Sequence, residues 1–222
     1  MTTQFVNLLE ELRRSSLRMA ACVEDMLHET AGVVFQPNEP LARRIINRDR
    51  EVDEQEVTVE AEVIRLLALY QPVGSDLRLL TTILKVTNDL ERVADCVVNI
   101  AERASHLEVQ EPANHNQDLK ELFPLVRRAL RDAVQAYASQ DAAAARRVIA
   151  DDEAIDELYS HIVHGVVAAA PGSPEQMAAQ LDLLSIAKNL ERIADHATNI
   201  AEDVVFLTTG SIIRHHKEED RS

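Results

Sequence analysis

The sequence predicts an all-α protein of six helices arranged in two similar halves. Glycine and aromatic residues are rare, with 5 Gly and 3% aromatics in 222 residues, whereas Ala, Leu, Val, Glu, Asp and Arg fill long stretches of helical period. Breaks rich in Pro, Gly or polar residues separate these stretches. In addition, the thirteen-residue segment 90–102 recurs at 190–202 with nine identical positions. Such a repeat at fixed spacing indicates an internal duplication.

Six helices are predicted from hydrophobic period and from the breaks between them. The first two end at Pro-containing breaks, 36–40 and 71–75. Ser75 and Ser173 stand where N-caps belong, and Pro174 suits a first helical turn. Asp141 is the candidate N-cap at a boundary that lacks both Pro and Gly. We expect the helices near residues 3–34, 40–70, 76–107, 118–138, 141–169 and 175–208.

The duplication extends to the helix upstream of each repeated segment. Residues 42–53 align with 145–156 at an offset of 103, so each half carries a D-x-x-x-D helix followed by an E-x-x-x-D helix. The polar, Pro-containing segment between the halves marks the domain boundary. We therefore expect a first bundle at 1–109, a second at 116–209, and a charged tail at 210–222.

Composition restricts the classes of partner and the compartment. A net charge of −15 and the absence of Trp argue against binding to a nucleic-acid backbone or stacking on its bases. The N-terminus has no basic region followed by an apolar core, and the chain has no uncharged apolar run of 18 residues. We expect a cytoplasmic protein without membrane insertion. Cys22 and Cys96 have no metal-site or disulfide spacing and are expected to be reduced and mostly buried.

Acidic residues form stripes on the predicted helices. Asp49, Asp53, Glu56 and Glu60 share one stripe of helix 40–70, flanked by apolar residues on both sides. Carboxylates in an apolar setting lose hydration and repel one another unless a cation compensates. This stripe therefore predicts a positive charge beside it.

A second acidic stripe, repeated in both halves, allows two interpretations. Glu91 and Asp95 recur as Glu191 and Asp195, and the stripe could be a solvated face in which Arg92 bridges to Asp95 at i,i+3. The alternative is a metal site in each half, since Asp and Glu oxygens are hard ligands suited to Mg, Ca, Mn or Fe. The duplication favours the metal site. His196 aligns with Cys96 and is expected to pack, with a ligand role left open.

Three segments resemble the PhoU family, the phosphate-specific transport system accessory proteins. They are 70–78, 88–95 and 189–200, and the resemblance extends over nearly the whole chain. It implies two pseudo-symmetric three-helix bundles. It also implies that their paired E(D)-x-x-x-D motifs bind divalent or trivalent metal ions (Fe, Mn, Mg or Zn) in multinuclear clusters. By that likeness one site would use Asp49, Asp53, Glu91 and Asp95, and the other Asp152, Asp156, Glu191 and Asp195. Because Glu56 and Glu60 align with Tyr159 and Val163, we expect the second site to bind metal more weakly.

The same resemblance implies a biological role. Such a protein would be a cytoplasmic, often dimeric negative regulator that links a phosphate ABC transporter ATPase to a sensor histidine kinase at the inner face of the membrane. A regulator of a different transporter remains the first alternative. A carboxylate-bridged di-metal oxidase or ferroxidase is disfavoured, because none of the 8 His follows a Glu by three residues. No nucleophile motif or Gly-rich phosphate loop is present, so we expect no enzymatic activity and no catalytic residues.

Overall fold

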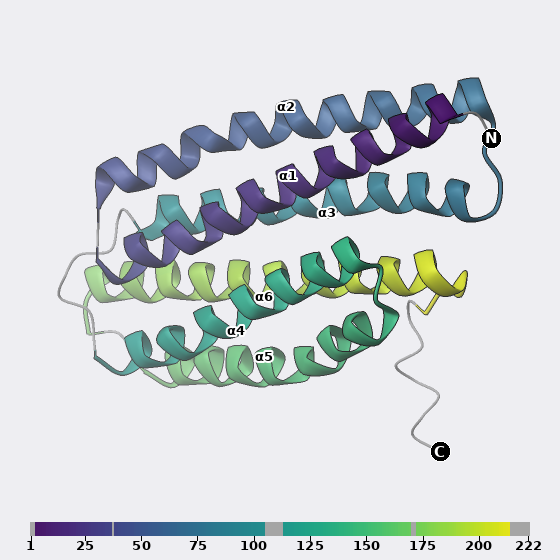
Figure 1. The fold of residues 1–222 in the computed structure, drawn as a ribbon. Helices are drawn as coiled ribbons and strands as arrows, with labels where there is room; N and C mark the ends of the chain where they lie inside the picture. The colour runs from purple at the N-terminus through teal and green to yellow at the C-terminus, as the bar shows by residue number, and fades with distance from the viewer. Residues whose placement is uncertain (1–2, 37, 105–112, 170–171, 214–222) are drawn as a thin grey trace, which may run out of the picture.

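The computed structural model describes residues 3–36, 38–104, 113–169 and 172–213, and these residues form α-helices and no strand. The all-α fold class is confirmed. Helices α1–α3 make one bundle and α4–α6 a second, and the two lie side by side (Figure 1). The helices are α1 (Thr3–Phe35), α2 (Glu39–Tyr70), α3 (Ser75–Ala104), α4 (Ala113–Ser139), α5 (Ala142–Ala168) and α6 (Pro174–Thr209).

Side-chain caps explain where several helices begin. The Asp141 side chain accepts hydrogen bonds from two backbone N–H groups of the first turn of α5, and the Ser173 hydroxyl accepts one from the backbone N–H of Gln176 in α6. The prediction that Ser75 is the N-cap of α3 is wrong by one position. The backbone N–H of Arg78 donates to the carbonyl oxygen of Gly74, which makes Gly74 the N-cap. That residue has φ 61°, a left-handed conformation that suits glycine. The predicted residues 105–107 lie outside the described residues.

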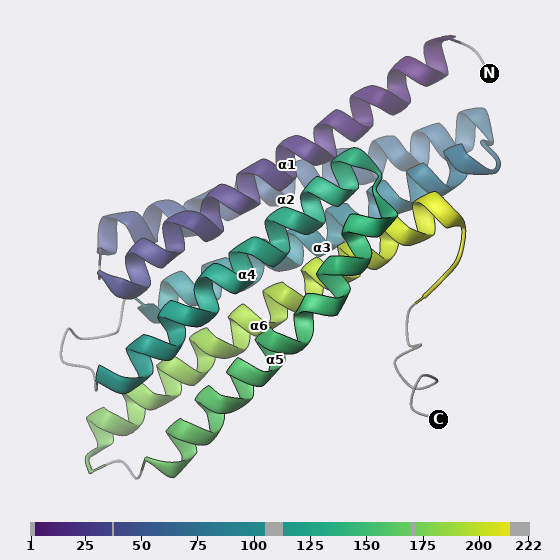
Figure 2. The ribbon, with the colours of Figure 1, turned by 60° about the horizontal axis from the view of Figure 1, so that its bottom comes forward.

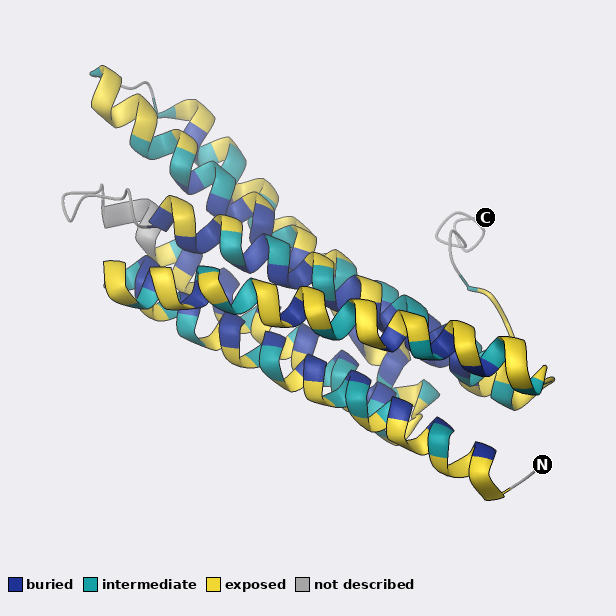
Figure 3. Ribbon diagram, turned by 90° about the horizontal axis from the view of Figure 1, so that it is seen from above, coloured by how far each residue is buried: buried dark blue, intermediate teal, exposed yellow. Residues whose placement is uncertain are grey.

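The two bundles repeat one another in their pattern of buried residues. In α1 and α4 the buried apolar positions correspond at an offset of 103, as for Val23 and Val126; in α3 and α6 the offset is 100, as for Leu90 and Leu190. Figure 3 shows these buried stripes facing the interior while the outer faces are exposed. Helices α3 and α6 are therefore equivalent elements of a duplicated fold.

Antiparallel packing of α3 against α6 forms the main seam between the bundles (Figure 2). Ion pairs that cross this seam include Lys85 Nζ with Asp203 Oδ1 at 3.0 Å and Arg103 Nη1 with Asp182 Oδ1 at 3.5 Å. The Asp203 side chain is 2% exposed, so its charge is compensated inside the interface.

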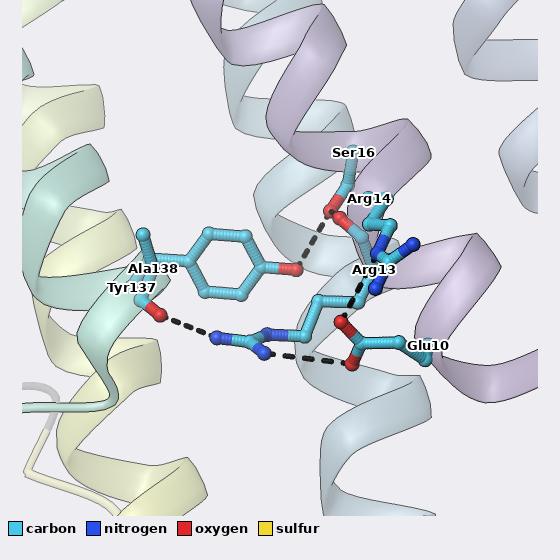
Figure 4. Close-up of polar contacts among 6 residues, drawn as sticks. All are labelled: Glu10, Arg13, Arg14, Ser16, Tyr137 and Ala138. Atoms are coloured by element: carbon cyan, nitrogen blue, oxygen red, sulfur yellow. Dashed lines mark hydrogen bonds and ion pairs between the residues drawn. The ribbon is translucent and has the colours of Figure 1, made fainter. Parts of the chain in front are cut away.

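A second contact between the bundles joins α1 to α4 (Figure 4). The buried hydroxyl of Tyr137 lies 2.8 Å from Ser16 Oγ, and Arg13 donates to the carbonyl oxygen of Ala138 in the last turn of α4. Phe35 and Phe123 meet edge to face at 5.7 Å between ring centroids.

Along its described length the chain has no helix long and apolar enough to cross a membrane.

Candidate functional site

The first acid cluster lies between α2 and α3. Asp49 and Asp53 are one turn apart on α2, and Glu91 and Asp95 are one turn apart on α3, so each pair occupies one helical face. Burial raises the pKa of Asp49, and the charges of Asp53, Asp95 and Glu102 raise it further. The structure thus brings the two predicted pairs into one electrostatic neighbourhood.

The second acid cluster occupies the equivalent place between α5 and α6. Its members are Asp152 and Asp156 on α5 with Glu191 and Asp195 on α6. Burial, followed by the charges of Glu191, Asp152 and Asp156, raises the pKa of Asp195 to about 6. Lys188 is the cation that opposes this shift. All eight predicted site residues therefore fall into two groups of four, one in each half.

The predicted apolar setting of the α2 stripe is only partly correct. Asp49 and Glu56 are half-buried, but Asp53 and Glu60 are exposed. Among the described helices, α2 packs against α1 and α3 alone, so its buried face is narrow. Val57, one of the apolar residues expected to flank the acids inside the bundle, is 63% exposed for the same reason.

Local partners satisfy some of the carboxylates in the first cluster and leave others open. Arg92 Nη1 lies 3.3 Å from Asp95 Oδ2, which is the predicted i,i+3 bridge. Asp49 Oδ1 and Glu91 Oε2 are buried and accept no hydrogen bond, although Arg92 Nε lies 3.3 Å from the latter. Buried carboxylate oxygens without hydrogen bonds are costly.

The side chains of this cluster offer carboxylate oxygens, the kind of ligand that hard cations prefer. Asp49 Oδ1 accepts no hydrogen bond, and Glu91 Oε2 lies 3.3 Å from Arg92 Nε. Within the described residues, however, no three Asp, Glu, His or Cys side chains are grouped as a ready-made metal site. The arrangement places carboxylates and their negative charge on facing helices.

The histidine and cysteine that differ between the two repeats lie at the seam. His196 Nδ1 is 2.9 Å from Asp89 Oδ1, and Asn199 Nδ2 donates to the same oxygen at 3.4 Å. His196 therefore joins α6 to α3, in line with its expected packing role. Cys96 is buried, and burial raises the pKa of its thiol to about 11. Both cysteines are free, Cys96 buried and Cys22 half-buried.

Sequence reasoning did not single out Lys188, which lies against the second cluster. Its Nζ is 2.7 Å from Glu191 Oε2 and 5.3 Å from the centroid of the Tyr159 ring. The repeat contains a signal for this residue, because Lys188 aligns with Asn88 at the offset of 100. A change from amide to ammonium beside paired carboxylates alters the charge of the site.

Known proteins share this architecture and sequence. Among solved structures, PhoU from Pseudomonas aeruginosa superposes with a TM-score of 0.89 at 31% identity, covering 93% of this chain and 100% of that one. The phosphate transport system regulatory protein PhoU from Streptococcus pneumoniae gives 0.87 at 29% identity, covering 94% and 99%.

Curated relatives agree with the structural comparison. A phosphate-specific transport system accessory protein PhoU homolog from Pseudomonas putida is 34% identical over 96% of this chain and 83% of its own length. One from Deinococcus radiodurans is 34% identical over 91% and 95%. The model of the PhoU domain matches residues 16–104 and 119–204, one copy in each bundle. On sequence, fold and internal duplication together, this chain belongs to the PhoU family.

Proposed function

We propose that the protein is a metal-binding regulator of phosphate uptake and of the phosphate-starvation response. It acts as a homodimeric negative regulator in the cytoplasm, between a phosphate ABC transporter and a sensor histidine kinase at the inner face of the membrane. The relatives named above are accessory and regulatory proteins of phosphate transport. Metal binding is supported by one observation: Asp49 and Asp53 on α2 face Glu91 and Asp95 on α3, and the buried Asp49 Oδ1 accepts no hydrogen bond.

The metal is a divalent or trivalent cation, and several carboxylates on facing helices can bridge more than one ion. Like charges that are held together and partly desolvated raise the free energy of the folded chain. A polyvalent cation that binds them removes this cost and stabilises the folded state by mass action. Each half carries such a cluster, so the proposal predicts a cation-dependent increase in stability.

Regulation through contact, rather than catalysis, fits the surface of the protein. The pairs Arg43–Arg44 and Arg146–Arg147 are exposed and stand out on a chain of net charge −15. We propose that the second pair contacts an acidic patch of a partner. Arg43 and Arg44 are the weaker candidates, because they form ion pairs with Glu39 and Glu29 at 2.6 and 2.9 Å.

Elemental analysis tests the metal site directly. Protein purified without chelator should carry metal, and the double variant Asp53→Asn/Asp95→Asn should carry less. The matched control is Glu51→Gln/Glu54→Gln, which removes the same charge from exposed positions of α2. Equal metal content in all three proteins would refute the first site.

A deletion strain tests the regulatory role. Without the protein, phosphate-scavenging genes should be expressed even in abundant phosphate, and wild-type protein should restore repression. Arg146→Glu/Arg147→Glu should weaken repression while changing the free energy of unfolding by less than about 0.5 kcal/mol, as for other surface changes. Normal repression in the deletion strain would instead favour a PhoU-family regulator of a different transporter.

A further inference from the structure

Helices α1 and α4 lie side by side across the junction of the two halves (Figure 2). A hollow of about 240 Å³ opens between them, away from both acid clusters. Its lining includes Glu24 and Leu27 of α1 and Arg127, Arg128, Leu130 and Arg131 of α4. The hollow therefore gathers three guanidinium groups against one carboxyl group, on a chain whose net charge is −15.

The three arginines are exposed and lie within about one turn of α4, so their side chains share one edge of the helix. Within the part of the chain that the structure describes, Arg127 has no hydrogen bond or ion pair. Arg128 and Arg131 each lie 3.5 Å from one carboxylate oxygen, of Asp151 and Asp132 respectively. Exposed ion pairs of this kind contribute little free energy. All three guanidinium groups therefore remain available to an anion.

The basic set belongs to α4 alone. At the offset of 103, the three arginines correspond to acidic residues and a histidine of α1, which are Glu24, Asp25 and His28. The buried leucines beside them, Leu27 and Leu130, correspond at the same offset and are retained. The packing of the duplicated fold thus requires the leucines and does not require the arginines.

The chemistry and size of the hollow suit a small oxyanion. Guanidinium groups donate paired hydrogen bonds whose geometry matches phosphate and carboxylate oxygens. A phosphate ion carries more than one negative charge at neutral pH and presents oxygens on all sides, so it can accept from more than one arginine. The volume lies below the roughly 300–1,000 Å³ of pockets for drug-sized ligands. A small ion fits this space better than a larger molecule does.

Glu24 is the one acid among the described residues that line the hollow, and it is half-buried. Burial raises the pKa of its carboxyl group, Arg131 opposes this effect, and the neighbouring Asp25 adds to it. A carboxyl group that is harder to ionise repels an incoming anion less. Glu24 thus limits the affinity of the hollow for anions without cancelling its positive charge.

We propose that the hollow between α1 and α4 is a binding site for a small oxyanion, and that inorganic phosphate is its ligand. The arginines bind the anion, and Glu24 lowers its affinity through charge. The choice of phosphate among oxyanions rests on the proposed function, because a regulator that binds the ion directly can respond to its concentration. The site itself rests on the residues of the hollow.

Substitutions of opposite expected effect test the site. Arg127→Gln should weaken phosphate binding by about tenfold, the equivalent of one hydrogen bond to a charged group. Arg127→Lys keeps the charge but loses the planar fork, so the loss should be smaller. Glu24→Gln removes a like charge from the hollow and should strengthen binding severalfold. Arg50→Gln is the matched control, because it removes the same charge from an exposed position of α2 and should bind as wild type does.

Equilibrium dialysis of the full chain against radiolabelled phosphate measures stoichiometry and affinity. Chloride holds the ionic strength constant, since screening weakens contacts between exposed charges. Prior treatment with chelator removes any metal through which phosphate could be held at the acid clusters. Far-UV circular dichroism checks that each variant is folded, which we expect because the substituted side chains are exposed or half-buried.

One saturable phosphate per chain, bound more weakly by Arg127→Gln and more tightly by Glu24→Gln, supports the proposal. The proposal is wrong if folded wild type shows no saturable binding, or if these two variants bind as wild type does. It is also wrong if Arg50→Gln weakens binding as much as Arg127→Gln, because attraction by the whole surface then accounts for the affinity. None of these results bears on the metal-binding and regulatory roles, which elemental analysis and the deletion strain test.

Discussion

In the buried contact between Tyr137 and Ser16 (Figure 4), we expect removal of the two hydroxyl groups to cost unequal amounts of stability. Ser16 Oγ donates its only hydrogen to the carbonyl oxygen of Arg13 at 2.9 Å, so Tyr137 is the donor in the 2.8 Å contact with Ser16. Both residues are 0% exposed. Water therefore does not replace a partner that is removed.

The two single substitutions should differ in cost for this reason. Tyr137→Phe removes the donor and leaves Ser16 with its bond to Arg13, at a cost of about 1 kcal/mol. Ser16→Ala leaves the tyrosine hydroxyl buried without an acceptor, at about 2 kcal/mol. The double variant should cost about 1 kcal/mol rather than the additive 3, because no tyrosine hydroxyl is then left buried without an acceptor.

Urea unfolding at 25 °C, followed by circular dichroism, measures the four free energies of this cycle. For a chain of this length each kcal/mol corresponds to about 2–4 °C in Tm. Ser139→Ala is the control, because Ser139 is exposed and should change stability by less than about 0.5 kcal/mol. Strict additivity, or a Ser16→Ala variant no less stable than Tyr137→Phe, would refute the assigned direction of the hydrogen bond.

Three further predictions concern stability. In chelator-treated protein, Asp195→Asn should stabilise the fold at pH 7. The folded pKa of about 6 exceeds the ordinary 3.8, so the free energy of unfolding of the wild type falls as pH rises between these values. The variant has no carboxyl group at this position and should lack that fall. The full shift corresponds to about 3 kcal/mol, but Asp195 is exposed and screening leaves about 1 kcal/mol; an unchanged pH profile in urea unfolding would contradict it. Lys85→Met should cost about 2 kcal/mol, because it removes the ammonium group 3.0 Å from the buried Asp203 carboxylate, and a thermal melt equal to wild type would exclude that role. Gln71→Gly should add about 0.5 kcal/mol, because Gln71 has φ 45°, and destabilisation would show that its side chain matters more than its backbone.

The helices and the two acid pairs could be predicted from sequence because their signals are local or repeated. Asp141 and Ser173 mark helix starts through their own side-chain oxygens. The recurrence of Glu91 and Asp95 as Glu191 and Asp195 separates these acids from ordinary solvated residues. Periodicity determines the face of a helix on which a residue lies, and this is sufficient to place acids one turn apart on the same face.

The exposure of Asp53 and the contacts at the seam could not be predicted in the same way. Periodicity does not tell how many helices pack against α2. In the described part of the chain two helices do, so the buried face of α2 is narrow. The contact of Asp89 with His196 depends on the antiparallel register of α3 and α6, which brings together residues 107 positions apart. Local sequence patterns carry no information about that register.

Duplication explains why the two halves can share a core and differ in their sites. Val23 and Val126, or Leu90 and Leu190, fill equivalent positions of a close-packed interior, where changes in volume are costly. The cluster edges are more exposed, so replacing Glu56 with Tyr159, or Asn88 with Lys188, alters charge at little cost in packing. The positions free to diverge in charge after duplication are thus the more exposed ones at the edges of the clusters.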